Sequence, residues 1–226
     1  MMADGMAAGA VACAAESEMV AEAVPHGIAE ALVAVGRRMD ARGWVPATAG
    51  NLSARLGVDR LAITRSGVHK GFLTPADIMA VDFAGRSLSP GLKPSAETLL
   101  HCQIYALWPE VGAVLHGHSV PATALTMALP GRTEIRLEGY EVLKAWSDVI
   151  TSHEATIALP IIENDQDMQR LAARLEPLLK AGEAPIGYVL RGHGVYVWGA
   201  DVQAALYRLE ALEFLLATEI ERRKLA

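Results

Sequence analysis

The sequence has few of the residues on which several protein classes depend. Its only cysteines are Cys13 and Cys102, too few for a disulfide framework or for a structural zinc site built on cysteine ligands. No uncharged stretch approaches the length of a membrane-spanning helix. The first twenty residues include three acids and no basic segment, so they do not resemble a secretory signal peptide. We therefore expect a protein of the reducing cytoplasm with no membrane partner.

An excess of positive charge is also absent. The formal net charge is -6, and the sequence has no basic stripe that would neutralise the phosphates of a nucleic acid. A small anion can still be held locally. With 226 residues, of which 52% are hydrophobic, the chain is long enough to bury one sizeable core. We expect residues 1–24 to form a flexible N-terminal extension and residues 25–226 to form a single domain.

Apolar periodicity predicts alternating strands and helices. Ile28, Leu32, Val35 and Met39 recur at helical spacing, and Gly43 follows as a stop signal. The other predicted elements are a hairpin with strands at 52–56 and 60–64, a short helix at 74–77, a strand over 79–83, a helix from Ala96 towards Trp108 capped by Ser95, a helix opened by Pro121 and a C-terminal helix over 202–220. Hairpins between single helices favour a mainly antiparallel sheet covered by helices.

Three histidines accompany two apolar runs. His116 and His118 follow the run 111–115, and His193 lies within a second strand-like run at 187–197. Side chains two residues apart on a strand project to the same face, so two imidazoles can face one point and His193 can complete a three-nitrogen site. Three protein ligands leave the fourth tetrahedral position open, as in catalytic zinc sites. The alternative is that these are ordinary polar residues at strand ends.

Small polar turns offer contacts for a phosphate group. Asn51, Ser66 and Gly67 lie in turns with exposed backbone amides, and Ser95 offers a hydroxyl beside the expected start of a helix. Ordinary turn and cap chemistry explains the same residues. Glu97, near the start of the same helix, either faces a ligand or merely complements the helix dipole.

These segments together resemble the class II aldolase and adducin family. The resemblance runs from Ile28 to the C-terminal helix and rests on Gly50-Asn51-Leu52-Ser53, Ser66-Gly67, Lys93-Pro94-Ser95-Ala96-Glu97, His116-Gly117-His118 and Arg191-Gly192-His193-Gly194. It implies an α/β fold of three α/β/α layers around a central, mainly antiparallel sheet, and a single catalytic domain over residues 25–226.

The same resemblance implies a set of site residues and an assembly. It places one Zn²⁺ per subunit on His116, His118 and His193. Asn51, Ser66-Gly67 and Ser95 contact the phosphate of a small sugar-phosphate substrate. The protein is then a cytoplasmic homo-oligomer, most often a homotetramer.

Three further segments are most similar to the dehydratases of this family: Gly139-Tyr-Glu-Val-Leu-Lys144, Leu159-Pro-Ile-Ile-Glu-Asn164 and His193-Gly-Val-Tyr-Val-Trp-Gly199. They imply zinc-dependent removal of water from a ketose phosphate, with Glu141 as the principal acid-base residue. Family aldolases use the glutamate at the position of Glu97, whereas some dehydratases have cysteine there. Because the chain has both acids, the role of Glu97 stays open. Without the resemblance, Glu141 would be a solvated acid paired with Lys144.

Two alternatives to dehydration remain at this stage. Glu97 is compatible with aldol cleavage of a sugar phosphate between C3 and C4, and an adducin-like binding module would keep the fold without catalysis. The complete histidine set disfavours the binding module, because three converging imidazoles would otherwise be costly buried polar groups. The other histidines lie outside the motifs, and we expect surface or capping roles for His26, His69, His101 and His153.

Overall fold

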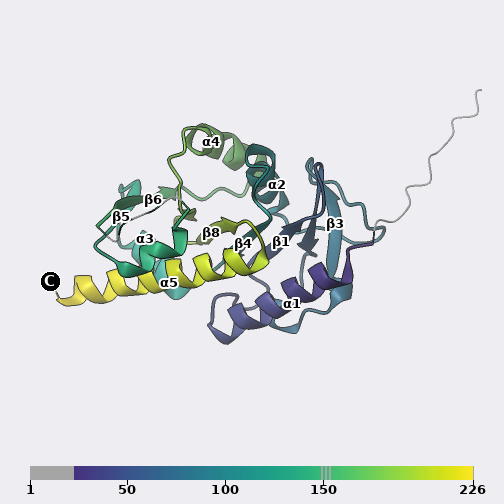
Figure 1. The fold of residues 1–226 in the computed structure, drawn as a ribbon, viewed down its shortest axis with the longest axis horizontal. Helices are drawn as coiled ribbons and strands as arrows, with labels where there is room; N and C mark the ends of the chain where they lie inside the picture. Colours follow the sequence, from purple (N-terminus) through teal and green to yellow (C-terminus); the bar gives the residue numbers. More distant parts are fainter. Residues whose placement is uncertain (1–22, 149, 151, 153, 226) are drawn as a thin grey trace, which may run out of the picture.

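The computed structural model describes residues 23–148, 150, 152 and 154–225. The expected N-terminal extension, residues 1–24, lies almost wholly outside this range, as does His153. Within the described residues, an eight-stranded sheet lies between two sets of helices (Figure 1). None of the helices in these ranges combines the length and apolarity needed to cross a membrane.

The strands follow the order β3-β2-β1-β4-β8-β7-β6-β5 across the sheet. They are β1 (Asn51–Arg55), β2 (Arg60–Thr64), β3 (Ile78–Asp82), β4 (Ala113–Gly117), β5 (Glu134–Glu138), β6 (Thr156–Ile162), β7 (Tyr188–Leu190) and β8 (Gly194–Gly199). Of the strand pairs in the described ranges, only β6 with β7 is parallel. The prediction of a mainly antiparallel sheet is therefore confirmed.

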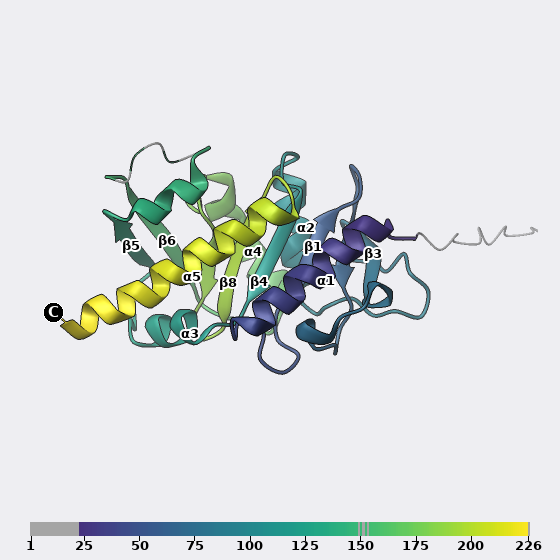
Figure 2. The same ribbon diagram turned by 60° about the horizontal axis from the view of Figure 1, so that its bottom comes forward.

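The helices cover both faces of this sheet. They are α1 (His26–Ala41), α2 (Thr98–Leu107), α3 (Val120–Met127), α4 (Met168–Lys180) and α5 (Val202–Leu225), with short 3₁₀ turns η1 (Lys70–Phe72), η2 (Pro75–Asp77) and η3 (Glu141–Trp146). Figure 2 shows α5 running diagonally across the sheet on the same side as α1 and α3. On the opposite side lie α2 and α4, so the α/β/α layers predicted from the resemblance are confirmed.

Strand alternation divides the apolar residues between the two layers of core. Leu115 and Val197 are paired neighbours on β4 and β8, and both pack with α1, α3 and α5. The adjacent pair, Val114 and Trp198, packs with α2 and α4 on the other face. Successive side chains on a strand point to opposite faces, so one strand contributes to both cores. The central strands are thereby buried on both sides, and side chains at their ends are shielded from water.

The predicted start of the second long helix was wrong by two residues. Helix α2 begins at Thr98, and Ser95 does not cap it through its hydroxyl. The Oγ atom of Ser95 instead accepts a hydrogen bond from Asn51 Nδ2 at 3.1 Å, while Ser95 O accepts one from Thr98 Oγ1 at 2.7 Å. Glu97 therefore lies just before the helix, where its side chain is directed across to β1.

The apolar run at 187–197 forms two strands rather than one. Strands β7 and β8 are antiparallel neighbours, and the turn between them carries His193. Gly192 has φ +63°, a backbone angle that L-residues rarely adopt. A Cβ at Gly194 would lie 2.2 Å from Gly117 O, so only glycine lets β8 approach β4 this closely. His193 thus reaches the end of β4 from a tight turn.

Candidate active site

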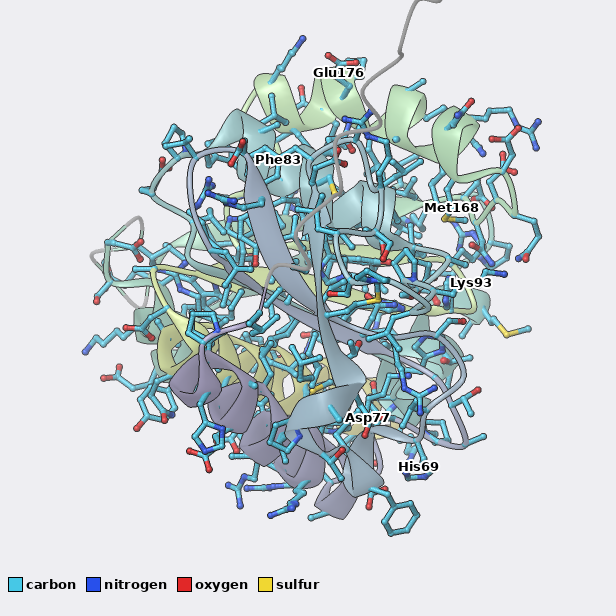
Figure 3. The ribbon with its side chains drawn as sticks, turned by 90° about the vertical axis from the view of Figure 1, so that its right-hand side faces the viewer. His69, Asp77, Phe83, Lys93, Met168 and Glu176 are labelled. Atoms are coloured by element: carbon cyan, nitrogen blue, oxygen red, sulfur yellow. The ribbon has the colours of Figure 1, made fainter. Side chains whose placement is uncertain are left out.

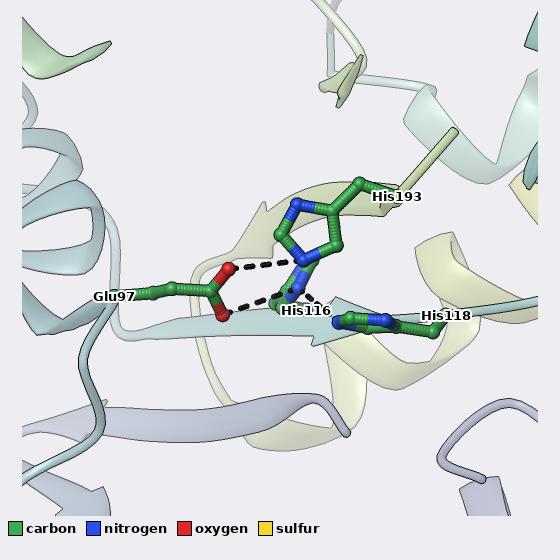
Figure 4. Close-up of side chains that lie close together, drawn as sticks. All are labelled: Glu97, His116, His118 and His193. Carbon is green, nitrogen blue, oxygen red and sulfur yellow. Dashed lines mark hydrogen bonds and ion pairs between the residues drawn. The ribbon is translucent and has the colours of Figure 1, made fainter. Parts of the chain in front are cut away.

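The three predicted histidines converge with Glu97 at one end of the central strands (Figure 4). His116 is the penultimate residue of β4, His118 lies one residue beyond that strand, and His193 comes from the β7–β8 turn. Their ring nitrogens and a carboxylate oxygen of Glu97 all lie within 4.8 Å of one another. The site therefore combines four side chains from three separate parts of the chain.

Short contacts connect these four side chains. The Nε2 atom of His116 lies 2.8 Å from Nε2 of His118 and 3.3 Å from Oε2 of Glu97. Nε2 of His193 lies 3.0 Å from Oε1 of the same carboxylate. The three imidazoles and the acid thus direct their polar atoms at one small volume.

Outer hydrogen bonds fix which nitrogens face that volume. His116 Nδ1 lies 2.9 Å from Val195 O, and a carbonyl oxygen only accepts, so Nδ1 carries the proton of the neutral ring. In the same way, His193 Nδ1 donates to Asn164 Oδ1 at 3.2 Å. Their Nε2 lone pairs therefore face inward, towards a carboxylate, and such bonds commonly orient metal-binding histidines. Two inward lone pairs and an acid fit a bound cation.

The protonation states also suit metal binding. Burial lowers the pKa of His116 to about 4 and that of His118 to about 3, so both rings are neutral at pH 7. Burial acts to raise the pKa of Glu97, but His116, His193 and the Asn51 hydrogen bond outweigh it and hold the pKa well below its usual range. Neutral imidazoles and an ionised carboxylate are ligands in their binding-competent forms.

A cavity of about 460 Å³ opens beside these side chains. All four residues predicted to contact a phosphate, Asn51, Ser66, Gly67 and Ser95, line it, together with Glu97, His118 and His193. Its size is within the range of small-molecule sites. The structure therefore brings the predicted phosphate contacts and the histidine cluster to one cavity.

The side-chain amide of Asn51 makes hydrogen bonds within the protein that the sequence did not indicate. Its Nδ2 group donates to Glu97 Oε2 at 2.6 Å and to Ser95 Oγ at 3.1 Å. Both amide protons thus bond to protein groups. A side-chain contact from Asn51 to a phosphate would require one of these bonds to break.

Lys70 is a cavity residue that the sequence reasoning missed. The residue is only 3% exposed, yet it lines the cavity. Its Nζ donates to Thr48 O at 2.6 Å and to Val68 O at 2.8 Å, which leaves one of three ammonium protons for another acceptor. Burial lowers its pKa to about 8. Its place three residues after Gly67 was the available signal, but the pattern is the same as that of a surface lysine.

Glu141 lies away from this cluster within one chain. It opens η3, which follows the edge strand β5, and it is not among the residues that line the cavity. Its side chain is 70% exposed and accepts a hydrogen bond from Lys144 at 2.5 Å. That pairing is the simpler alternative offered by the sequence, and the catalytic role of Glu141 stays a prediction.

The remaining described histidines divide between expected and unexpected places. His26 is exposed and pairs with Glu30 at 3.0 Å, and His69 caps η1 by accepting from Gly71 N at 3.1 Å, so the predicted surface and capping roles are confirmed for both. Figure 3 shows His69 at the periphery of the molecule. The prediction was wrong for His101, which is fully buried behind Asn51, because its helix face packs against β1.

Known proteins share this fold and much of this sequence. The model of the class II aldolase and adducin N-terminal domain family matches residues 30–220. A methylthioribulose-1-phosphate dehydratase from Granulibacter bethesdensis is 64% identical over 206 residues, covering 89% of this chain and 94% of the relative. A methylthioribulose-1-phosphate dehydratase from Acidiphilium cryptum is 62% identical over 199 residues, covering 87% and 92%.

A solved structure gives the same fold. The crystal structure of L-fuculose-1-phosphate aldolase from Thermus thermophilus aligns with a TM-score of 0.68 at 25% sequence identity. The alignment covers 87% of this chain and 94% of that one.

Proposed function

This chain belongs to the class II aldolase and adducin family, and we propose that it is a methylthioribulose-1-phosphate dehydratase, a hydro-lyase. The segments 139–144, 159–164 and 193–199 already predicted this enzyme among the family's members, and the similarity to named dehydratases at 64% and 62% identity bears that prediction out. The observation that carries the proposal is the histidine cluster beside the cavity, since a dehydratase needs a site where a metal ion and a small substrate can meet.

The proposed reaction converts 5-methylthioribulose 1-phosphate to 5-methylthio-2,3-dioxopentyl phosphate and water, as a step of methionine salvage. A base takes the proton from C3, and the electron pair of that C–H bond forms a double bond to C4. The C4 hydroxyl leaves with a proton as water. The enol that remains tautomerises to the second ketone, so the atoms and electrons balance without an oxidant.

We assign one Zn²⁺ per subunit to His116, His118 and His193. The inward lone pairs and neutral rings described above support this assignment. When bound, zinc supplies Lewis acidity towards the oxygen atoms of the ketose, which is typically worth several kcal/mol at the transition state. The chain's own contribution is to hold three imidazoles and the Glu97 carboxylate around one point before the substrate arrives.

Proton transfer needs a carboxylate at the reacting carbons. Within one chain Glu97 meets this requirement, because it is ionised and lines the cavity. The sequence favoured Glu141 for the principal transfer, and this role requires a second copy of the chain to bring Glu141 to the cavity. The proposed homotetramer would allow that. Cytoplasmic location is likewise part of the proposal.

We place the substrate phosphate beside Ser66 and Gly67. Gly67 has φ +78°, and a Cβ there would meet no atom within 4 Å, so open space adjoins this turn. The Lys70 ammonium adds a positive charge to the same cavity wall. Replacement Ser66→Asp would set a negative charge against the phosphate. We expect KM to rise strongly with the zinc content intact, and an unchanged KM would remove Ser66 from the phosphate site.

One assay separates dehydration from its nearest rival. The likeness to an aldolase of L-fuculose 1-phosphate, and the presence of Glu97, favour aldol cleavage as the second candidate. Incubation with methylthioribulose 1-phosphate should give the diketone phosphate and water. Dihydroxyacetone phosphate with methylthioacetaldehyde would instead establish cleavage. A protein that neither binds zinc nor converts this substrate by either reaction would be a non-catalytic module.

A further inference from the structure

A row of polar side chains runs into the core behind Glu97. Asn51 and Ser53 are two residues apart on β1 and therefore share a face, whereas His101 and Tyr105 are four apart on α2 and share a helix stripe. The two pairs interlock where α2 packs on the sheet, and all four side chains are almost fully buried. Polar groups in this environment are costly unless each finds a partner.

Each member of the row does find a partner. Asn51 Oδ1 meets His101 Nε2, His101 Nδ1 lies 2.6 Å from Ser53 Oγ, and Ser53 Oγ lies 2.9 Å from the Tyr105 hydroxyl. The Asn51 amide nitrogen closes the row against Glu97 at 2.6 Å. The result is a continuous chain of hydrogen bonds from Tyr105 to the carboxylate at the histidine cluster.

The carboxylate determines the direction of every bond in this chain. An ionised acid only accepts, so the Asn51 amide must turn its NH₂ group to Glu97 and its oxygen to His101. His101 then carries its proton on Nε2. Burial lowers the pKa of His101 to about 3, so the ring is neutral and its Nδ1 accepts. Ser53 donates to that nitrogen and accepts from Tyr105.

The opposite direction is disfavoured at the Glu97 end of the chain. At the Ser53 end, a proton on His101 Nδ1 would turn the Ser53 hydroxyl to the Tyr105 oxygen at 2.9 Å or to Val114 O at 3.4 Å, so this end permits either direction. At the other end the Asn51 amide would be reversed, with its oxygen 2.6 Å from Glu97 Oε2. Two acceptors at that distance repel each other.

We propose that His101 is a positioning residue for proton transfer by Glu97. With Ser53 and Tyr105 behind it, His101 fixes the Asn51 amide, and the amide holds the Glu97 carboxylate against the histidine cluster. Asn51 then serves chiefly to orient the acid rather than to bind phosphate. The kinetic consequence rests on the proposed dehydratase function, whereas the tautomer of His101 does not.

The first test compares His101→Leu with His101→Gln. Leucine has no N–H to offer Asn51, while the amide nitrogen of glutamine can take the place of Nε2–H. His101→Leu should lower kcat on the order of ten- to a hundredfold, the usual cost of removing a group that orients a site ligand. KM and zinc content should stay near wild-type values, and His101→Gln should recover most of the rate. An equal loss in both variants would overturn the proposal.

Cys102→Ala provides the matched control. Cys102 is the next residue on α2 and is also buried, but it belongs to the apolar core and not to the polar row. Truncation there disturbs the packing of the same helix and should leave kcat close to wild type. If Cys102→Ala lowered kcat as much as His101→Leu, the effect would be one of helix packing and His101 would have no positioning role.

A double-mutant cycle tests whether His101 acts through Asn51. If it does, adding His101→Leu to Asn51→Leu should reduce kcat no further, because the amide that His101 orients is already gone. Losses that multiply would show an independent role and contradict the proposal.

The tautomer of His101 can be measured without an activity assay, by NMR of the ring nitrogens in protein with labelled histidine. His101 should show one neutral ring with the proton on Nε2, unchanged across about pH 6 to 8. Ser53→Ala removes the donor to Nδ1 but keeps the Asn51 oxygen that faces Nε2, so the proton should stay on Nε2 and kcat should fall less than in His101→Leu. This variant also serves if His101→Leu does not fold. A proton on Nδ1 in the wild type would overturn the proposal. An inactive protein with the Nε2–H tautomer would refute the dehydratase function alone.

Discussion

The two acids that the sequence offers for catalysis lie in contrasting parts of the molecule. Glu97 is 13% exposed and contacts two histidines and Asn51, whereas Glu141 is 70% exposed and pairs with Lys144. Both belong to motifs shared with the same family. A motif therefore identifies an acid as a candidate, while its surroundings decide whether one chain can use it.

The sheet explains the contrast. Glu97 is directed at β1 and β4, central strands covered by helices on both faces, where little water surrounds the carboxylate and charges interact strongly. Glu141 follows β5 at the edge of the sheet, in contact with solvent. An exposed acid has an ordinary solvated environment until another surface covers it. Glu141 at the edge of the sheet therefore needs a second subunit to cover it before it is as buried as Glu97 is within one chain.

The largest effect is expected at the centre, from loss of a histidine. His116→Ala removes one of three inward-facing nitrogens and leaves His118, His193 and Glu97 as the described side chains of the cluster. We expect loss of zinc together with a fall in kcat/KM of about ten-thousandfold or more, since Lewis-acid stabilisation is worth several kcal/mol. Metal analysis and turnover are measured on the same sample. His26→Ala, at an exposed histidine, is the control, and full zinc with normal turnover in His116→Ala would exclude His116 as a ligand.

The next effect compares the two acids directly. Glu97→Gln keeps the size of the side chain but cannot take a proton, so kcat should fall on the order of a hundred- to ten-thousandfold with zinc retained. Glu141→Gln should show a loss of the same order if the role predicted from the sequence holds. A fall below about tenfold in either variant is too small for general acid-base catalysis and would remove that residue from the role.

Mixed oligomers show where Glu141 acts. Subunits with His116→Ala and subunits with Glu141→Gln should each be inactive alone. If Glu141 serves the cavity of a neighbouring chain, a mixture contains sites with both groups intact, and activity should reappear after the subunits exchange. If Glu141 acts within its own chain, every site keeps a defect and the mixture stays inactive.

The sequence predicted the centre of the molecule better than its connections. Strand periodicity predicted that His116 and His118 share one face and that His193 can join them, and the three side chains do converge. Nothing in the local pattern showed that β1 would pack its Asn51 against His101, because that contact depends on the docking of α2 on the sheet. Tertiary packing is not encoded in a period of two or 3.6 residues.

A second buried acid, Glu213, sharpens the comparison with Glu97. Glu213 on α5 is 2% exposed, and burial raises its pKa to about 7 from an ordinary 4.5. The unfolded chain releases this proton near 4.5, so Glu213 reduces stability as the pH rises from about 4.5 to 7, and the loss is complete above 7. Burial alone thus disfavours the charge that Glu97 keeps through its neighbours.

Glu213→Gln should abolish this pH dependence. The gain over wild type should be small near pH 4.5 and approach about 3 kcal/mol above pH 7, from 2.5 pKa units at about 1.36 kcal/mol each. Denaturant unfolding at several pH values measures it. Glu221→Gln, at an exposed acid on the same helix, should leave the profile unchanged. If Glu213→Gln changed the free energy of unfolding by the same amount at all pH values, titration of the Glu213 carboxyl would not be the cause of the pH dependence.

The smallest effect is expected at Lys70, a buried cation that separates substrate binding from catalysis. Lys70→Met keeps an unbranched stem and removes the ammonium group. KM for the phosphorylated substrate and the inhibition constant for inorganic phosphate should therefore both rise about tenfold, as for loss of one charge-assisted hydrogen bond. Zinc content and kcat should change little. In the wild type, Lys70 loses its proton as the pH rises through about 8, so KM should climb above that pH, whereas KM of Lys70→Met should not.

Lys180→Met, at an exposed lysine on α4, is the control. If KM of Lys70→Met stayed at the wild-type value across this range, Lys70 would be a structural residue that braces the carbonyls of Thr48 and Val68, and the phosphate would lie elsewhere in the cavity.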